Sequence, residues 1–421
     1  MRGSASNASV VGCGTSLTRS IHESVRPHGG HHCQQWTRSV GSGAGKSDST
    51  MAVVASKFQV LSATHQRESS IWNELVDQAP MPDVYYRPGY ARTIEAAGHG
   101  KAIALLINGP NTQVLMPLLL RPLSDLPFAA GETGFDAITP YGYGGLLPLS
   151  EIQRPSATEV HAILDALRQW CLETGVASCL IRLHPFLFQD HWVGPEEGCS
   201  QGRVLSCRAV TFAVDLTRWD REHQRIAGMR TDRRSSLNRA RCCLEVTWSE
   251  RDVSLAESLS VFRDIYEQRM AQLNANSYYF FPTRYYLSVV ANLTDHLGVA
   301  LAWRDGRPVA ASLFLAERQF AHYHLSGSTD EGRRSGAPTL LINAGAEWAS
   351  ERGCRLLHLG GAANDAHGLY NFKSSFGGPT YHYYTLDVIA DEPKYQGLTE
   401  ERTKFQLLPL MRDGFFPRYR A

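Results

Sequence analysis

The residues best suited to chemistry lie near the end of the chain, where a lysine stands among aromatic residues and glycines. The run that starts at Gly353 reads Gly-Cys-Arg-Leu-Leu-His-Leu-Gly-Gly, and segment 368–378 contains Phe372, Lys373 and Phe376. The pattern predicts a helix end, a short buried strand, a Gly-Gly break and a turn that holds Lys373. Because an ammonium is costly to desolvate unless an anion meets it, we expect Lys373 to act on a ligand or a reacting group. In the alternative, its stem packs on the aromatic rings and its head reaches water.

A loop rich in tyrosine and glycine is a second candidate site. Residues 140–145 read Pro-Tyr-Gly-Tyr-Gly-Gly, which places Tyr141, Tyr143 and Gly144 after a predicted strand. Glycines let backbone amides approach a ligand, and tyrosines offer stacking surfaces and hydroxyls. The loop either binds a substrate or forms a tight turn whose tyrosines pack against a neighbouring domain. The residues alone leave both alternatives open.

Two histidines in segment 320–328 indicate a strand that borders a cleft. Alternation places His322 and His324 on one face and Tyr323 with Leu325 on the other, so that one face lines the cleft and the other the core. Two histidines at this spacing could bind a metal. No third ligand stands at a suitable spacing in the sequence, and we therefore predict no metal site.

Arginines between residues 218 and 241 form the main basic feature of the chain. On a helix, Arg230, Arg233, Arg234 and Arg241 fall near one face, which could bind phosphates through paired N–H groups. A charge run is more often the solvated surface of a helix, and the residues alone favour that interpretation.

The composition limits the classes of protein that the chain can belong to. It has 421 residues, 43% of them hydrophobic, with a net charge of +1, which predicts a globular protein without bulk attraction to nucleic acid or anionic membranes. Any RNA contact must come from a local patch. No apolar run approaches the roughly 18 residues that span a bilayer. The 9 cysteines include no CxxC pair, which favours reduced thiols in the cytoplasm over a disulfide framework or a zinc site.

The order of the predicted elements gives the fold class. Residues 1–54 are rich in Ser, Gly and Thr and are predicted to be a disordered, dispensable leader. Two similar successions of helices and strands then predict an α/β (α+β) fold of two tandem domains, at 55–205 and 206–390. Each would be a mixed twisted sheet flanked by helices. Residues 391–421 would form a C-terminal segment that could pack back on the first domain.

Several of these segments together resemble the Fem-type aminoacyl transferases of the GNAT-like acyltransferase superfamily. The resemblance covers residues 205–390 well and 70–200 more faintly. It is strongest over four segments, at 233–246, 324–328, 359–361 and 372–377. It implies paired GNAT-like domains that transfer an aminoacyl group from a charged tRNA to an amine acceptor. Sustained heptads are absent, so the chain resembles the type without a coiled-coil arm.

The resemblance also implies roles for the residues described above. Lys373 would be the main electrostatic catalyst, and Tyr323 is a second predicted catalytic residue. The predicted substrate-binding residues belong to the basic helix, the tyrosine loop or the lysine segment: Arg230, Arg233, Arg234, Tyr141, Tyr143, Gly144 and Phe372. The arginines would contact phosphates of the donor, and the tyrosines would border the acceptor pocket.

One departure from the superfamily bears on the donor. Acetyl-CoA-dependent GNAT enzymes hold the pyrophosphate in an Arg/Gln-x-x-Gly-x-Gly/Ala turn at a helix N-terminus. The corresponding turn at 333–338 ends in Pro338, which has no N–H to donate. An ordinary CoA donor is therefore disfavoured for this half of the chain, and the first half has no such motif.

Three hypotheses of function follow, in order of preference. The first is an aminoacyl-tRNA-dependent transferase that forms an amide on a peptidoglycan precursor or a small peptide-like metabolite. The second is a GNAT-like N-acyltransferase that uses acyl-CoA or an acyl carrier, and the turn that ends in Pro338 disfavours it. The third is a non-catalytic binding module of the same fold, which Lys373 disfavours. The predicted chemistry needs orientation and oxyanion stabilisation, with no cofactor other than the donor itself.

Overall fold

A computed structural model describes residues 57–151, 155–187, 189, 202–251, 254–362, 367–405 and 414–421. The predicted leader at 1–54 lies outside the described residues. Residues 55–421 form a compact unit of their own. Among the described residues, every helix is too short or too polar to span a bilayer.

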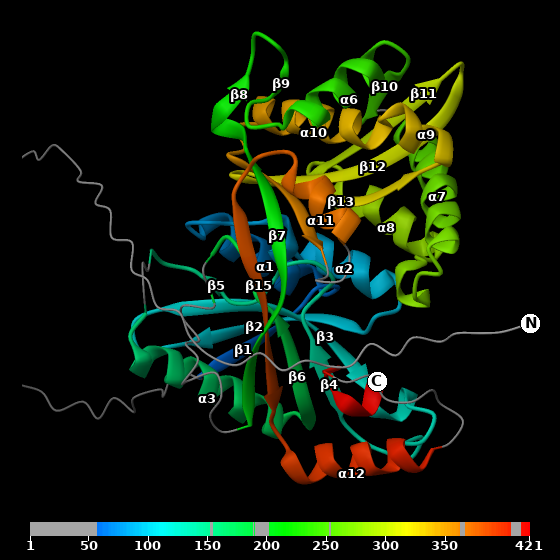
Figure 1. Cartoon of the computed structure of the whole chain (residues 1–421). Coiled ribbons are helices and arrows are strands. Elements are labelled where there is room, and N and C mark those ends of the chain that lie inside the picture. Colours follow the sequence, from blue (N-terminus) through cyan, green and yellow to red (C-terminus); the bar gives the residue numbers. More distant parts are fainter. Residues whose placement is uncertain are drawn as a thin grey trace, which may run out of the picture. The chain divides into compact units, whose positions relative to one another are not determined.

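The first half of this unit runs in the order strand, two α-helices, three strands, a further strand of two residues, α-helix, strand (Figure 1). Strands β1 to β4 pair antiparallel in succession, and β4 pairs parallel with β6 across the helix α3. The elements are β1 (Phe58–Ser62), α1 (Gln66–Gln78), η1 (Val84–Tyr86), α2 (Pro88–Ala96), β2 (Lys101–Asn108), β3 (Gln113–Pro122), η2 (Leu123–Asp125), β4 (Phe135–Ile138), β5 (Leu147–Pro148), α3 (Ala157–Glu173) and β6 (Val176–Arg182).

The second half repeats this order. Strands β10 to β13 pair antiparallel, and β13 pairs parallel with β14 after two consecutive helices. Its elements are β10 (Glu245–Ser249), α7 (Leu255–Gln272), η4 (Ser277–Tyr279), α8 (Thr283–Leu293), β11 (Leu297–Arg304), β12 (Arg307–Glu317), β13 (Phe320–Ser328), α9 (Asp330–Ser335), α10 (Ala337–Glu351) and β14 (Leu356–Ala362). The predicted α/β fold with two similar halves is confirmed.

Two long strands, β7 and β15, join the sheets of the two halves into one. β7 (Arg203–Asp215) follows the first half in the chain but pairs with β14 of the second. β15 (Thr380–Ile389) follows the second half but pairs with β6 of the first, and β7 and β15 pair with each other. Figure 1 shows them side by side, β7 in green and β15 in orange. One sheet therefore runs through both halves, in the order β1-β2-β3-β4-β6-β15-β7-β14-β13-β12-β11-β10.

The segment between β7 and β10 carries the basic residues of the sequence. It contains η3 (Leu216–Arg218), the small hairpin of β8 (Trp219–Asp220) and β9 (Arg225–Ile226), and the helix α6 (Thr231–Arg241). Leu237 and Ala240 of α6 are buried in the core of the second half. The basic segment is thus a helix docked on the second half and not a free linker.

The turn between β11 and β12 illustrates how local sequence fixes the register. Asp305 and Gly306 have φ angles of 50° and 72°, and Arg304 pairs with Arg307 across them. Two consecutive residues with positive φ make a turn whose twist matches that of the strands, and an Asp-Gly pair adopts it readily.

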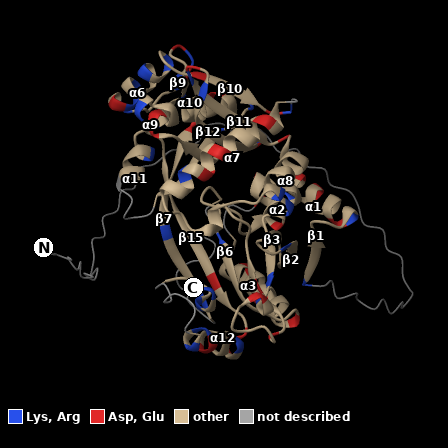
Figure 2. Ribbon diagram, turned by 90° about the vertical axis from the view of Figure 1, so that its right-hand side faces the viewer, with Lys and Arg blue, Asp and Glu red and all other residues tan. Residues whose placement is uncertain are grey.

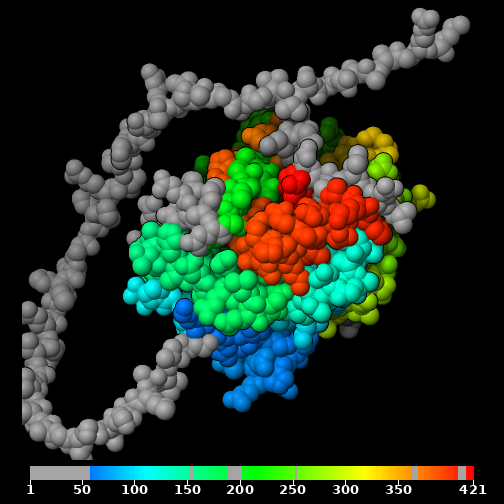
Figure 3. All heavy atoms as spheres, turned by 90° about the horizontal axis from the view of Figure 1, so that it is seen from below, coloured from blue at the N-terminus to red at the C-terminus, as the bar shows by residue number. Residues whose placement is uncertain are grey.

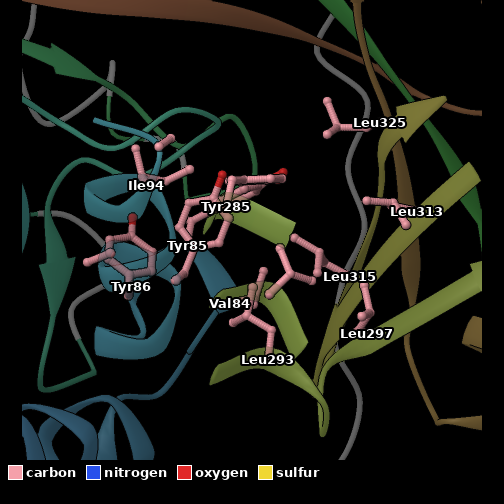
Figure 4. Packing of buried hydrophobic residues seen from close by; sticks show 14 of the residues in the cluster. Val84, Tyr85, Tyr86, Ile94, Tyr285, Leu293, Leu297, Leu313, Leu315 and Leu325 are labelled. Carbon is pink, nitrogen blue, oxygen red and sulfur yellow. The ribbon is translucent and has the colours of Figure 1, made fainter. Parts of the chain in front are cut away.

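The halves also meet through packed side chains and one buried ion pair. Val84 and Tyr85 of η1 lie in the same apolar cluster as Leu313 and Leu325 of the second half (Figure 4). The guanidinium of Arg87 donates to Glu317 at 2.7 and 3.0 Å, and each residue is 6% exposed. Because a buried charge needs a partner, this bidentate pair fixes η1 against β12.

The C-terminal segment contacts the first half. Tyr419 in η5 (Arg418–Arg420) is fully buried, and its hydroxyl lies 2.7 Å from the hydroxyl of Ser178 in β6. Arg420 forms an ion pair with the buried Asp136 of β4. Figure 3 shows α12 (Glu392–Lys404) in orange-red on the face seen from below.

Two local predictions near the lysine are wrong. Phe372 and Lys373 lie in a helix, α11 (His367–Ser374), and not in a turn. The Gly360-Gly361 pair does not end the preceding strand, because β14 continues to Ala362. Instead, the register with β7 shifts between His358 and Gly360, which leaves Leu359 as the extra residue of a bulge within the strand; we call residues 359–361 the glycine bulge.

Candidate functional site

A cavity of about 890 Å³ opens where the two halves meet. In the first half, its walls come from η1, the tyrosine loop and β6. In the second half they come from α7, β13, α10 and β14, and the flanking helices α6 and α11 complete them. Tyr141, Tyr143, Tyr323, Phe372 and Lys373 all border it. With Arg233, which also borders it, the structure gathers six of the nine predicted site residues around one space.

The cavity wall is cationic. No Asp or Glu occurs among the described residues that border it, whereas six basic residues do: Arg182, Arg208, Arg233, Arg269, Arg333 and Lys373. In Figure 2, blue segments on β6 and β7 mark basic residues within the otherwise tan middle of the sheet. A concave surface with one sign of charge attracts ligands of the opposite sign. The site therefore favours an anionic ligand.

Two of these arginines hydrogen-bond neutral groups within the described residues. Arg182 donates to the carbonyl oxygen of Thr139 at 2.7 Å. Arg233 donates to the hydroxyls of Ser375 and Thr339, at 2.9 and 3.1 Å. Because these acceptors carry no charge, both guanidinium groups can attract a ligand anion.

Lys373 lies over the glycine bulge of β14. Its Nζ donates a 2.7 Å hydrogen bond to the carbonyl oxygen of Gly361. Gly360 has a φ angle of 76°, and a Cβ atom there would lie 3.3 Å from the Nζ. Glycine therefore provides both the backbone angle and the space that the ammonium needs. Burial lowers the pKa of Lys373 from its ordinary value of 10.5 to about 8.

The side chains beside Lys373 extend the basic wall. Phe372 borders the cavity on one side and stacks under the guanidinium of Arg233, whose Cζ lies 4.8 Å from the ring centroid. Such a cation–π contact holds the arginine in place without using its N–H groups. Arg233 is thus held next to the residue that precedes Lys373, and both cations border the cavity.

The tyrosine loop is held rigidly against the lysine segment. The hydroxyl of Tyr143 accepts the N–H of Gly361 at 3.2 Å. Tyr90 donates to the carbonyl oxygen of Tyr141 at 2.6 Å, and Tyr86 donates to that of Gly144 at 2.6 Å. Tyr141 and Tyr143 border the cavity, but Gly144 does not. Its predicted role in substrate binding stays a prediction.

The predicted alternation along β13 is wrong. His322, Tyr323, His324 and Leu325 all border the cavity, on no single face of the strand. The register shifts here, because Leu313 pairs with Leu325 but Phe314 pairs with Tyr323, which leaves His324 as the extra residue. A bulge of this kind turns side chains that would alternate, and it is common beside functional sites.

The arginines of the basic segment divide into two groups. Arg233 borders the cavity, whereas Arg230 and Arg234 do not. Arg230 pairs with Asp232 at 2.9 Å, and Arg234 donates to the hydroxyl of Thr231 at 2.9 Å. The predicted contacts of Arg230 and Arg234 with a substrate stay predictions.

The turn before α10 also borders the cavity, through Arg333, Gly336, Pro338 and Thr339. Gly336 is left-handed, with a φ angle of 86°, and Pro338 lies in the first turn of α10. The N–H of Thr339 donates to the carbonyl oxygen of Gly336 at 3.0 Å. The first turn therefore offers fewer free N–H groups to a pyrophosphate than an ordinary helix N-terminus.

Three buried residues that the sequence did not single out together lie behind the cavity wall. Asp83 Oδ2 lies 3.0 Å from His184 Nε2 and 2.8 Å from His322 Nε2. Each of the three is at most 1% exposed. Asp83 lies 101 residues before His184, and His184 lies 138 residues before His322. A local sequence motif therefore could not reveal the group.

These three residues could in principle hold a metal ion, since their ligand atoms lie within 4.8 Å of one another. However, His184 Nδ1 accepts the N–H of Phe186 at 3.1 Å, which places the proton of the neutral ring on Nε2. A metal at that Nε2 would require a ring without any proton, whereas histidine ligands ordinarily keep one N–H for an outer acceptor. The arrangement fits a hydrogen-bonded group better than a metal centre.

Comparison with known proteins agrees with this architecture. Residues 228–374 match the family described as acetyltransferase (GNAT) domain. The solved structure of FemX is 14% identical, with a TM-score of 0.58, over 78% of this chain and 97% of that one. A tandem GNAT protein from the clavulanic acid biosynthesis pathway is 16% identical, with a TM-score of 0.45, over 78% of this chain and 97% of that one. No curated protein sequence matches the chain.

The predicted Fem-like, GNAT-type fold is confirmed by these matches and by the repeated halves of the sheet. The domain match covers β13, α10, β14 and α11, which supply most of the second half's share of the cavity wall. The part of the chain that matches the acetyltransferase (GNAT) domain family thus includes Lys373 and much of the cavity wall.

Proposed function

We propose that this chain transfers an aminoacyl group from a charged tRNA to the amine of a second substrate, forming an amide. The observation that carries the proposal is the cationic cavity, bordered by six basic residues and, among the described residues, by no carboxylate. Both a tRNA terminus and a nucleotide-linked or peptide-like acceptor carry negative charge. Ester aminolysis also develops negative charge on the carbonyl oxygen, which a nearby ammonium stabilises.

Lys373 is the proposed electrostatic catalyst. One of its three N–H donors is engaged by the carbonyl of Gly361, so that two remain for a substrate. The bond to Gly361 and the absence of a Cβ at Gly360 hold the ammonium at the cavity wall. A charge held in place before the reaction stabilises an oxyanion without reorganisation at the moment of attack.

The basic residues come from two regions, which suits two anionic substrates. Arg182 and Arg208 both lie near Tyr383, where their charges oppose the rise in its pKa caused by burial. Arg233 lies instead on Phe372 and Thr339, near the start of α10. We infer that one region binds phosphates of the donor and the other binds the acceptor, with Tyr141 and Tyr143 between them.

An acyl-CoA donor is the alternative. The start of α10 borders the cavity, as a pyrophosphate site would require. Pro338 has no N–H, and that of Thr339 is engaged by Gly336, so that a CoA pyrophosphate would find few amides. The Arg233 and Arg333 side chains could replace them, which keeps this donor as the second candidate.

A donor screen distinguishes the two candidates. The full chain would be incubated with a mixture of charged tRNAs or with a mixture of acyl-CoAs, against peptidoglycan precursors and small peptides, and amide products would be detected by mass spectrometry. We expect products from the charged tRNAs, with a rate that falls steeply as salt rises. Products from acyl-CoA alone would contradict the proposed donor, and products from neither would contradict the function.

A further inference from the structure

His322 is the only member of the buried Asp83 group that borders the cavity. It lies in β13 at the bulge, while Asp83 stands before η1 and His184 follows β6. Asp83 Oδ1 also accepts the N–H of Tyr85 at 3.2 Å. Three donors therefore converge on one carboxylate, which holds it between the two halves.

The protonation states of the group follow from these contacts. Burial alone would raise the pKa of Asp83, but His322 and His184 together hold that pKa well below its ordinary value. An ionised carboxylate only accepts hydrogen bonds, so that both histidines must present an Nε2–H to it. In a neutral His322, the lone pair is then on Nδ1.

The Nδ1 of His322 is buried and has no hydrogen-bond partner among the described residues. His184 differs, because its Nδ1 accepts the N–H of Phe186. His324 differs as well, because its two ring nitrogens lie 3.4 and 3.3 Å from the hydroxyls of Tyr85 and Tyr285. A buried polar atom without a partner is costly, and because the residue His322 borders the cavity, a ligand that binds there can supply the partner.

His322 and Lys373 belong to one continuous row of contacts. The ring of His358 lies 5.6 Å from that of His322 and 4.4 Å from that of Tyr143. The hydroxyl of Tyr143 accepts the N–H of Gly361, whose carbonyl accepts Lys373. All of these residues border the same cavity. A substrate that lies along the row can meet the imidazole at one end and the ammonium at the other.

We propose that His322 is the general base that accepts a proton from the acceptor amine, and that Asp83 and His184 are positioning residues that fix its tautomer. This inference rests on the proposed function. The amine nitrogen uses its lone pair to form a bond to the ester carbonyl carbon, and its proton passes to Nδ1 of His322. The ester C–O bond then breaks, and the leaving hydroxyl oxygen keeps the electron pair and takes the proton back from Nδ1. The net reaction converts an amine and an ester into an amide and an alcohol, with His322 unchanged.

The test compares His322→Gln with the unmodified chain under single turnover, with the donor and acceptor identified by the screen. A glutamine amide can still donate to Asp83, but it has no basic nitrogen. We expect the rate of amide formation to fall about 100- to 10,000-fold, the usual contribution of a general base, with the melting temperature changed little. His161→Ala, at a half-buried histidine of α3 that does not border the cavity, serves as the control and should keep the full rate.

Asp83→Asn tests the positioning role. The asparagine amide can donate as well as accept, so that it no longer requires the proton of His322 on Nε2. We expect kcat to fall while the KM of the acceptor stays the same, because the pocket itself is retained. A change in KM alone would place Asp83 in substrate binding and would contradict the proposed role.

The protonation of His322 can be measured without any substrate. Long-range nitrogen–proton NMR correlation of the full chain, with His322→Gln used to assign the signal, should show a proton on Nε2 and none on Nδ1. A proton on Nδ1 overturns the inference whatever the enzyme does. If the unmodified chain forms product and His322→Gln keeps its rate within about threefold, general-base catalysis by His322 fails while the proposed function stands. If the unmodified chain forms no product from any donor, the proposed function fails, and the inference fails with it.

Discussion

Lys373 on α11 donates to the carbonyl oxygen of Gly361 on β14, and the N–H of the same Gly361 donates to the hydroxyl of Tyr143 in the first half. One residue of the glycine bulge therefore connects the predicted catalytic lysine with the predicted acceptor loop. The two segments that the sequence analysis treated separately are parts of one site.

Replacing Lys373 by Met keeps the length of the side chain and removes its charge. We expect kcat to fall about 100- to 1,000-fold, because one preorganised oxyanion donor is lost. Rates at saturating substrate would be compared with those of Lys404→Met, which removes an exposed lysine of α12. A folded Lys373→Met protein with normal kcat would mean that this lysine has no part in the chemistry.

The free energy of unfolding should depend on pH because Lys373 is buried. Its pKa is lowered from 10.5 to about 8 on folding, so that between these values the unfolded chain binds more protons than the folded one. The free energy of unfolding contributed by this group therefore rises with pH across that window, and below it the full cost of the buried charge remains. Lys373→Met should be more stable than the unmodified chain at neutral pH. Chemical denaturation should show this advantage shrinking as the pH approaches 10.5.

The same titration predicts the pH dependence of catalysis. If Lys373 acts as an ammonium, kcat should fall as the pH rises through about 8, where the group loses its proton. The pH profile of kcat measures this directly. A profile that stays flat to pH 10 would exclude a role that depends on the charge.

Arg233 and Arg234 are adjacent but should differ in function. Arg233 borders the cavity and stacks on Phe372, whereas Arg234 does not border it. We expect Arg233→Gln to weaken binding of the anionic donor about tenfold or more and to reduce the dependence of binding on salt. Arg234→Gln is the matched control and should change both quantities little. Equal effects of the two variants on donor affinity would show that the helix surface, and not the cavity, attracts the donor.

The ion pair between Arg87 and Glu317 should stabilise the contact between the halves. Glu317→Gln removes the buried carboxylate and leaves the guanidinium only its ion pair with the more exposed Asp77, which we expect to cost about 1–3 kcal/mol in the free energy of unfolding. Glu267→Gln breaks the more exposed pair with Arg263 on α7 and should cost less than about 1 kcal/mol. Urea denaturation of the two variants measures the difference, and similar costs would mean that the buried pair contributes nothing specific.

Much of the fold could be predicted because the information is local. The apolar spacing of α3 and the Asp305-Gly306 turn determine their elements within a few residues. The joining of the two halves by β7 and β15 could not be predicted, since β15 pairs with β6 about 200 residues earlier in the chain. Only the folded sheet reveals that β15, a strand from beyond the second half, pairs with the first half, and that β7 links β15 to β14.

The candidate site was predictable only where its chemistry is unusual in sequence. A lysine among aromatic residues and glycines is rare enough to mark Lys373, although its helix was taken for a turn. The hydrogen-bonded group around His322 could not be predicted, because Asp83 and His184 stand in distant segments with ordinary sequences. The predicted alternation of side chains along β13 was wrong because of the bulge at His324. A single extra residue changes which side chains face the cavity.

The most direct test of the central claim is a single-turnover reaction with labelled aminoacyl-tRNA, in which the unmodified chain is compared with Lys373→Met. The account predicts that the label moves from the tRNA to the acceptor amine in the unmodified chain, and that Lys373→Met binds the same tRNA but transfers the label at least about 100-fold more slowly. Transfer at an equal rate by both proteins, or no transfer from any charged tRNA while acyl-CoA supports it, would contradict the account.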